Sequence, residues 1–268
     1  MRSHKRAFTV AITFISRVIA LRDRLTGWKE SDWQPAASDD SIARHVIVSG
    51  SNCLDAVFAR PAQGFARASV LICHGIGETV EYWLSVQRLL AENGVASLVF
   101  DYSGYGKSTG TIDWRQCEED AVAAFRFLQQ QTPEMPVSLL GFSMGSGIAA
   151  AITPRVEAHR LVLCAAFTSF RDAAHALGVP RAVSRGVPPI WRAEESLRDC
   201  SLPVLVVHGD RDRLFPVQMA SKLASCCGKD TELIIVPNLG HNQPYSRPEV
   251  SYWGPIVAWL ISKDDAVQ

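Results

Sequence analysis

Six short apolar runs alternate with helical stretches along most of this 268-residue chain. Each run is rich in Val, Leu and Ile, is followed by a turn, and leads into a segment with helical periodicity. Runs that are apolar at nearly every position are typical of strands buried on both faces of a parallel sheet. The runs cover 69–73, 96–100, 137–140, 161–165, 204–207 and 233–236, and helices are expected over 81–92, 114–130, 143–153, 217–226 and 249–261. We therefore predict a single α/β domain with a parallel sheet covered by helices on both faces.

Two segments depart from this alternation. Residues 45–48 and 54–59 flank a Ser-Gly-Ser-Asn turn and are expected to form a hairpin. About 35 residues separate the apolar run that ends near 166 from the run that begins near 202. Loops of that length inside a compact domain are usually functional. Because this one follows a strand, we expect it to rise above the carboxyl edge of the sheet, where ligands bind in such folds.

Composition excludes several classes of protein. The chain has 27 basic and 27 acidic side chains and is 47% hydrophobic, which argues against disorder and against a nucleic-acid partner. Seven cysteines, an odd number with no CxxC pair, argue against a disulfide framework and a zinc site. We therefore predict free thiols in a reducing, cytoplasmic compartment, and neither a metal nor a cofactor.

The amino-terminal segment differs from the rest of the chain. Residues 1–22 carry five basic side chains and no acidic one, so the remainder is net acidic by five. We predict a basic amphipathic helix over 1–28, a linker over 29–42 and the main domain over 43–268. The longest charge-free stretch, 7–16, is too short to span a membrane. Three interpretations stay open for the helix: packing on the body, peripheral membrane contact through residues 5–24, or a cleaved signal peptide.

The sequence Gly-Phe-Ser-Met-Gly at 141–145 lies between an expected strand and an expected helix. A serine in a tight strand-to-helix turn is exposed as a nucleophile, so the GxSxG motif indicates catalysis when it lies between a strand and a helix. The flanking glycines avoid collisions with the neighbouring strand and helix. The motif predicts Ser143 as a catalytic nucleophile.

A serine hydroxyl needs a base that is held by an acid. Among the seven histidines, His241 follows the last apolar run, in a loop expected at the carboxyl edge of the sheet. Asp212 follows the preceding run and is the expected orienting acid, whereas Asp210 is expected to bond the backbone of its own turn. His74 and His208 each end a strand and precede glycine, so we expect structural hydrogen bonds there. Nucleophile, acid and base then follow one another along the chain in the order expected of α/β-hydrolases.

Two backbone amides are candidates for an oxyanion hole. The His-Gly-Ile-Gly stretch at 74–77 leaves N–H groups accessible, and the residue after the nucleophile begins a helix. We assign the N–H groups of Ile76 and Met144.

The stretch 104–108 ends like a phosphate-binding loop, but Asp101 stands where that motif needs its first glycine. Asp101 is expected to cap the following turn, with the role of triad acid as its alternative.

Several aromatic and apolar residues are expected near the mouth of the site or in the long 167–201 interval. Ordinary packing and an acyl-binding pocket are both open for them. They are Tyr82, Trp83, Phe170, Leu177 and Trp191.

From about 43 to 262 the chain resembles an α/β-hydrolase-fold serine hydrolase, and within that superfamily the serine-aminopeptidase-like and monoacylglycerol-lipase-like branch, which includes protein depalmitoylases. The matching stretches are HGIGE at 74–78, FDYSGYGKSTG at 100–110, GFSMGSG at 141–147, FTSFRDAA at 167–174, HGDRDRLFP at 208–216 and GHN at 240–242. The resemblance implies an eight-stranded, mostly parallel sheet with a cap after strand six, here short and placed at about 168–201. The cap is short for a lipase lid, and the basic amino-terminal helix lies outside the core fold.

These features predict an enzyme that cleaves a carboxylic ester or thioester of a small molecule through an acyl-enzyme intermediate. One alternative is an aminopeptidase-like peptidase, which needs an acidic pocket for the substrate amine; Glu194 and Glu195 are its candidates. The second alternative is a non-catalytic binding module, which predicts a broken triad. Ser143, Asp212 and His241 are all present, which favours the enzyme.

Overall fold

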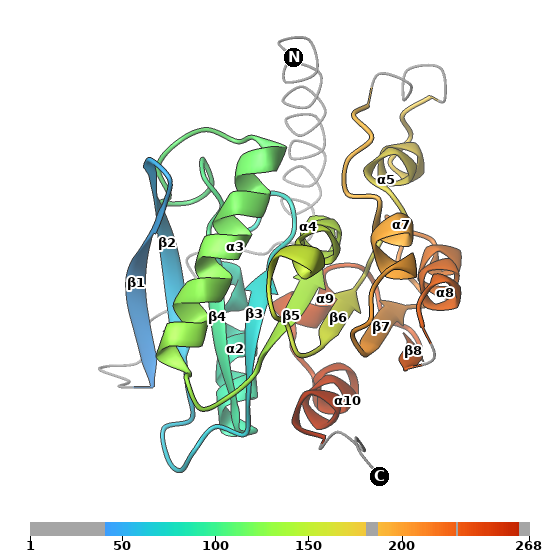
Figure 1. Ribbon diagram of the computed structural model, residues 1–268. Helices are drawn as coiled ribbons and strands as arrows, with labels where there is room; N and C mark the ends of the chain where they lie inside the picture. The colour runs from blue at the N-terminus through green and yellow to red at the C-terminus, as the bar shows by residue number, and fades with distance from the viewer. Residues whose placement is uncertain (1–40, 181–186, 229, 263–268) are drawn as a thin grey trace.

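An eight-stranded sheet forms the centre of the molecule (Figure 1). The computed structural model describes residues 41–180, 187–228 and 230–262, so the predicted amino-terminal helix and nearly all of the linker lie outside the described residues. The strand order is β1-β2-β4-β3-β5-β6-β7-β8. The strands are β1 Ile42–Ser49, β2 Asn52–Ala59, β3 Ala68–Cys73, β4 Val95–Phe100, β5 Val137–Phe142, β6 Leu161–Cys164, β7 Val204–Gly209 and β8 Thr231–Val236.

The pairing agrees with the predicted sheet. The β1–β2 hairpin is antiparallel, β2 pairs antiparallel with β4, and every other neighbouring pair is parallel. Strands β3, β4, β5, β6 and β7 are buried along their whole length, which explains their mostly apolar sequences. The edge strands β1 and β8 are partly exposed. All six predicted runs and the predicted hairpin are confirmed as strands.

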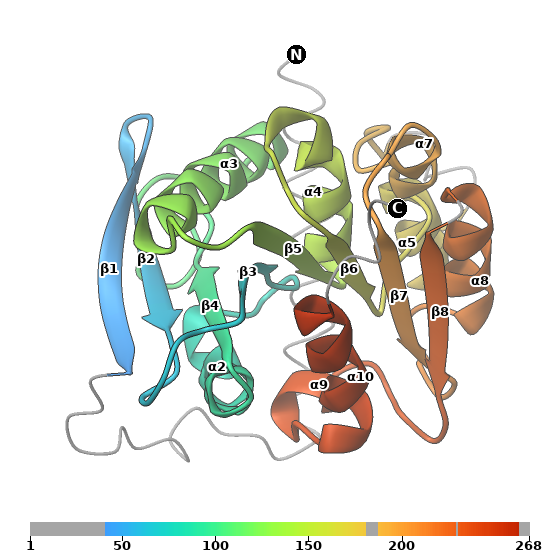
Figure 2. The same cartoon turned by 60° about the horizontal axis from the view of Figure 1, so that its bottom comes forward.

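Helices cover both faces of the sheet, in two layers that Figure 2 shows from the side. Helices α3, α4 and α8 pack on one face, and α2 and α10 pack on the other. A separate cluster of buried side chains fills each layer, because strand residues alternate between the two faces. The helices are α2 Leu84–Glu92, α3 Trp114–Gln131, α4 Met144–Ile152, α8 Val217–Cys226, α9 Gln243–Ser246 and α10 Val250–Ile261, with 3-10 turns η2 Val80–Trp83 and η3 Thr153–Arg155.

The long interval after β6 is not structureless. It contains two short helices, α5 Phe170–Ala176 and α7 Ala193–Arg198. Ser169 caps α5, because its hydroxyl accepts the Asp172 N–H and satisfies a free donor of the first turn. In the part of the chain that is described, no helix is both long and apolar enough to cross a membrane.

Candidate active site

Three side chains meet at the carboxyl edge of the sheet. Ser143 follows β5, Asp212 follows β7, and His241 follows β8. His241 Nε2 lies 3.0 Å from Ser143 Oγ, and His241 Nδ1 lies 2.6 Å from Asp212 Oδ2. All three side chains are nearly buried. The structure thus brings together a hydroxyl, an imidazole and a carboxylate that are 98 and 29 residues apart along the chain.

The backbone at Ser143 has an unusual conformation. Its φ is 51° and its ψ is −118°, a combination that non-glycine residues adopt only where the surrounding structure enforces it. Both flanking glycines are needed at this turn. A Cβ on Gly141 would lie 2.4 Å from the Gly145 carbonyl oxygen, and a Cβ on Gly145 would overlap the Cys73 carbonyl. Tight packing of β3 and β5 against the start of α4 therefore lifts the serine out of its turn.

The hydrogen bonds define the tautomer of His241. An ionised carboxylate only accepts, so Nδ1 carries the proton that binds Asp212. The neutral ring then offers the lone pair of Nε2 to the Ser143 hydroxyl, which donates. The rings of Phe142 and Phe215 lie 5.3 and 5.2 Å from the imidazole centroid and flank it. The imidazole is therefore held in one orientation by packing as well as by hydrogen bonds.

Asp212 is held by more than the histidine. Its Oδ1 accepts the N–H groups of Leu214 and Phe215, at 2.8 and 2.9 Å. Burial alone would raise the pKa of Asp212, but the hydrogen bond from His241, the electrostatic attraction of its N–H and the Phe215 amide together leave that pKa below its ordinary value. Asp212 is therefore ionised at neutral pH, as an acceptor for His241 must be.

A second histidine supports the loop that carries Asp212. The Nε2–H of His208 donates to the Phe215 carbonyl at 2.9 Å and lies 3.4 Å from Asp212 Oδ2. Burial lowers the pKa of His208, so its ring is neutral. His208 and His74 both bond to a backbone carbonyl, as the sequence predicted, but the closeness of His208 to Asp212 was not anticipated.

The prediction that Asp210 bonds the backbone of its own turn is wrong. Its Oδ1 accepts the N–H of Asn238 at 2.6 Å rather than an amide of its own turn. Asn238 belongs to the loop that leads to His241 and has a φ of 62°, in the left-handed region that Asn tolerates. Asp210 therefore ties the loop of the carboxylate to the loop of the imidazole.

The two candidate oxyanion amides lie on neighbouring segments. Gly145 packs directly against the Cys73 and His74 carbonyls, which brings the start of α4 next to the loop of Ile76. Ile76 and Met144 are both nearly buried. Among the hydrogen bonds of the described residues, neither amide has an acceptor. Both N–H groups are therefore free to bind an oxygen atom.

Asp101 clamps two loops. Its Oδ1 accepts the Val80 N–H at 2.8 Å, and its Oδ2 accepts the Lys107 N–H at 3.4 Å. A Cβ on Gly106 would overlap the Asp101 carboxylate, so this turn accommodates only glycine. Burial raises the pKa of Asp101 to about 6 despite the Val80 bond. These contacts agree with the predicted capping role.

The predicted pocket residues belong to two different layers of the core. Tyr82 and Trp83 pack on the sheet face that carries α2 and α10, whereas Phe170, Leu177 and Trp191 pack on the face that carries α3 and α4. Trp83 is fully buried against aromatic rings, and the Phe170 and Trp191 rings contact each other edge to face at 5.3 Å. Packing, one of the two interpretations open for these residues, accounts for the positions of Trp83, Phe170 and Trp191.

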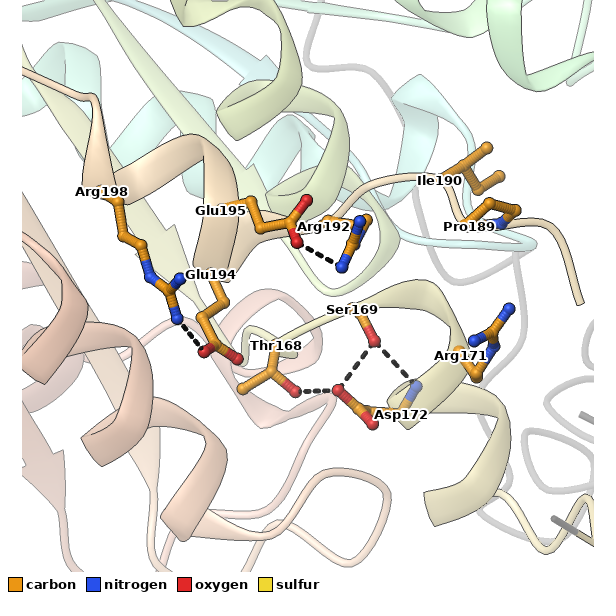
Figure 3. Close-up of a pocket in the computed structure, with 10 residues that line it drawn as sticks. All are labelled: Thr168, Ser169, Arg171, Asp172, Pro189, Ile190, Arg192, Glu194, Glu195 and Arg198. Carbon is orange, nitrogen blue, oxygen red and sulfur yellow. Dashed lines mark hydrogen bonds and ion pairs between the residues drawn. The ribbon is translucent and has the colours of Figure 1, made fainter. Parts of the chain in front are cut away.

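A polar hollow of about 460 Å³ lies between α5 and α7 (Figure 3). Glu194 and Glu195 line it, and both are paired with cations. Glu194 binds Arg198 at 2.8 Å and Lys222 at 2.6 Å, and Glu195 binds Arg192. No group of three or more His, Cys, Asp or Glu side chains in the described ranges is arranged to hold a metal ion. The hollow therefore offers no free carboxylate pair for a substrate amine.

Glu78 is a buried residue of this region to which the sequence reasoning gave no role. Its Oε2 accepts the Gly75 N–H and the Trp83 indole N–H. The only signal in the sequence was the position of Glu78 directly after the His-Gly-Ile-Gly stretch.

Comparisons with known proteins agree with this architecture. A family model described as serine aminopeptidase, S33, matches residues 64–192. A lysophosphatidylserine lipase of Macaca fascicularis, ABHD12, is 26% identical over 226 residues, covering 73% of this chain and 57% of the lipase. An uncharacterized protein of Mycobacterium tuberculosis is 28% identical over 185 residues, covering 68% of this chain and 65% of that protein. The chain thus spans less than two thirds of the length of these relatives.

Solved structures share the fold. An α/β-hydrolase from Vibrio vulnificus matches with a TM-score of 0.69 and 18% identity, over 91% of this chain and 85% of that one. A thermostable carboxyl esterase from Bacillus coagulans matches with a TM-score of 0.65 and 19% identity, over 83% of this chain and 99% of the esterase. The chain is therefore an α/β-hydrolase-fold protein whose sequence is similar to that of the serine hydrolases.

Proposed function

We propose that this protein is a serine hydrolase that cleaves a carboxylic ester or thioester. The observation that carries the proposal is the continuous hydrogen-bonded path from Ser143 Oγ through His241 to the ionised Asp212. A hydroxyl becomes a useful nucleophile at neutral pH when a neutral imidazole accepts its proton and a carboxylate stabilises the imidazolium that forms. The strained turn at Ser143 supports the same role, because it exposes the oxygen atom above the sheet.

In the proposed first step, His241 Nε2 takes the Ser143 proton while Oγ attacks the carbonyl carbon. The carbonyl oxygen gains negative charge and is stabilised by the N–H groups of Ile76 and Met144. The imidazolium then protonates the leaving alkoxide or thiolate as its bond to carbon breaks, which leaves an ester on Ser143. In the second step, His241 deprotonates a water molecule that attacks this ester, and the returned proton releases Ser143 and the carboxylic acid.

The surroundings favour esters over peptides with a free amino terminus. Binding an α-ammonium group requires an unpaired carboxylate, but Glu194 and Glu195 are paired with Arg198, Lys222 and Arg192. An additional ammonium would have to displace one of these cations. Because curated relatives are named lysophosphatidylserine lipases, monoacyl esters of glycerophospholipids are the first substrates to test.

Turnover of a substrate panel tests the proposal. The panel contains aryl esters of two to sixteen carbons, an acyl thioester, a monoacyl glycerophospholipid and amino-acid amides. We expect hydrolysis of at least one ester or thioester series and a loss of roughly 10⁴-fold or more in kcat for Ser143→Ala. A matched control is Ser146→Ala, which lies on the next turn of α4 and donates to the Ser143 carbonyl.

Two results would contradict the proposal. The first is faster cleavage of amino-acid amides than of every ester. The second is equal ester turnover by Ser143→Ala and the unaltered protein.

A further inference from the structure

The loop at 74–78 carries the proposed oxyanion donor Ile76 but belongs to no helix or strand. A backbone donor stabilises a transition state only if it is already aimed at the position that the oxyanion will occupy. Something other than secondary structure must therefore hold this loop. The buried polar groups around the loop identify what does.

Gly75 is bound at both ends of its backbone. Its N–H donates to Glu78 Oε2 at 2.7 Å, and its carbonyl accepts the Glu78 N–H at 3.4 Å. The same carbonyl also accepts the Nδ1–H of His74 at 2.8 Å. Glu78 thus closes a reciprocal pair of hydrogen bonds across the turn, in the way that a capping box closes a helix start.

Because a peptide unit is planar, holding the Gly75 carbonyl also fixes the direction of the Ile76 N–H. The Gly75 carbonyl and the Ile76 N–H belong to one planar, trans peptide unit and point in opposite directions. When the carbonyl is held towards His74 and Glu78, the N–H is held towards the other side. That plane is held by the His74 ring and the Glu78 backbone N–H, while the Glu78 carboxylate holds the preceding peptide through the Gly75 N–H. The carboxylate therefore acts on the Ile76 donor by fixing the turn at Gly75.

The carboxylate is itself fixed to the core. Its Oε2 accepts the indole N–H of Trp83 at 3.0 Å, and Trp83 is fully buried. The Trp83 ring contacts Phe142 at 5.6 Å between centroids, and Phe142 immediately precedes the proposed nucleophile. A Cβ on Gly75 would lie 2.5 Å from Glu78 Oε1, so only glycine lets the loop approach the carboxylate this closely. The loop is thereby held to the same aromatic layer that packs beneath Ser143.

We propose that Glu78 is a positioning residue for the oxyanion hole, because its carboxylate holds the Gly75 N–H and so fixes the turn that aims the Ile76 N–H before the substrate binds. The inference rests on the proposed ester hydrolysis and goes beyond it, because it assigns a role to a carboxylate that binds Gly75 and Trp83. An aimed donor acts on the charged transition state more than on the neutral substrate. Its loss should therefore lower kcat and leave KM nearly unchanged.

Kinetics on the full chain form the first arm of the test. We expect Glu78→Ala to lower kcat about 10- to 100-fold with KM within threefold, since removing a whole oxyanion donor costs about 10²–10³. Inhibition by an alkylboronic acid, whose serine adduct is tetrahedral and anionic, should weaken by a similar factor. Glu78→Gln keeps an acceptor oxygen and should restore kcat to within about fivefold.

A matched control separates positioning from stability. Gln87 is equally buried and bonds the Val57 and Ser97 carbonyls from α2, away from the loop. Gln87→Ala should lower the melting temperature and leave kcat and boronate affinity unchanged at temperatures below its transition. If Glu78→Ala does the same, the inference is overturned. If Glu78→Ala does not fold, Trp83→Phe takes its place, with an expected three- to tenfold loss in kcat; an unchanged kcat would overturn the inference.

Hydrogen exchange provides an arm that does not depend on activity. In the full chain, the amides of residues 74–79 should exchange at least tenfold faster in Glu78→Ala than in Glu78→Gln or Gln87→Ala. Unchanged exchange in Glu78→Ala overturns the inference even if the protein cleaves no ester. Conversely, faster exchange in a protein without ester turnover or Ser143 reactivity would contradict the proposed function and leave the loop constraint standing.

Discussion

Two buried pairs of histidine and aspartate lie at the carboxyl edge of the same sheet, yet only one of them is hydrogen-bonded to a serine hydroxyl. In the first, Asp212 Oδ2 lies 2.6 Å from His241 Nδ1. In the second, Asp101 Oδ1 lies 3.7 Å from His74 Nε2. The other ring nitrogen of His241, Nε2, is hydrogen-bonded to the Ser143 hydroxyl. The Nδ1–H of His74 instead donates a hydrogen bond to the Gly75 carbonyl.

The pKa values of the two carboxylates are shifted in opposite directions, although burial opposes ionisation of both. Burial raises the pKa of Asp101 to about 6, and burial also lowers the pKa of His74, to about 4. Burial likewise opposes ionisation of Asp212, but the N–H of His241 reverses the effect and leaves its pKa below the ordinary value. Proximity of an acid to an imidazole therefore does not define a triad. The direction of the N–H does.

The largest expected difference between the pairs is in turnover. Asp212→Asn should lower kcat about 10⁴-fold, because an amide in place of the carboxylate disfavours the tautomer that serves Ser143. Asp101→Asn keeps an acceptor for the Val80 N–H and should change kcat less than tenfold. Ester turnover of both variants at saturating substrate measures this contrast. Equal losses would mean that the two pairs are functionally alike.

The pH dependence of stability should separate the pairs as well. A carboxyl whose pKa rises on folding favours the protonated state, so ionisation of Asp101 opposes folding. Its contribution should fall by up to about 3 kcal/mol as the pH rises from 4 to 6. Asp212 has a lowered pKa, so its stabilisation is complete above the ordinary Asp pKa and is lost only at lower pH.

Urea denaturation of the two Asn variants and the unaltered protein at pH 4, 5, 6 and 7 tests these signs. Asp101→Asn should gain stability relative to the unaltered protein as the pH rises, whereas the difference for Asp212→Asn should stay constant over this range. A flat difference for Asp101→Asn would show that its carboxyl is not perturbed.

The supporting histidine of the first pair should matter moderately. His208→Phe removes the donor to the Phe215 carbonyl and the nitrogen 3.4 Å from Asp212, so we expect about a tenfold loss in kcat. His208→Gln keeps an N–H at a similar distance along the side chain and should lose less than threefold. Steady-state kinetics check both variants. A larger loss in His208→Gln than in His208→Phe would show that the ring shape of His208, rather than its donor, supports the loop.

The smallest expected effect is at Asp210. Its bond to the Asn238 N–H joins the two loops, but Asp210 is exposed to water, which can replace the lost acceptor. Asp210→Ala should therefore lower kcat less than threefold. A loss of tenfold or more would mean that this exposed tie, and not packing by Phe142 and Phe215, holds the imidazole in place.

The sheet could be predicted closely from the sequence, because strands buried on both faces are almost entirely apolar and most of them are followed by glycine-containing turns. Ser143, Asp212 and His241 could be selected for a related reason: each follows an apolar run, and the carboxyl ends of parallel strands meet at one edge. The helices α5 and α7 were missed, since each has fewer than eight residues and too few turns to show a period.

Contacts between loops were harder to predict. The partner of Asp210 lies 28 residues away, and nothing local distinguishes that bond from a turn of its own. Aromatic residues such as Tyr82 and Trp191 carry no signal that assigns them to one face of the sheet. Glu78 looked like an ordinary acidic residue, because its role depends on Trp83, whose ring reaches back from the next 3-10 turn.

The central claim is that Ser143 is activated by the first histidine–aspartate pair and not by the second. Labelling with a fluorophosphonate, followed by mass spectrometry of the modified peptide, tests it most directly. We expect one adduct on Ser143, a labelling rate within threefold of the unaltered protein for Asp101→Asn, and a rate at least 10³-fold slower for Asp212→Asn. An adduct on another residue, equal labelling of Ser143→Ala, or a slow rate in Asp101→Asn with a normal rate in Asp212→Asn would contradict the claim.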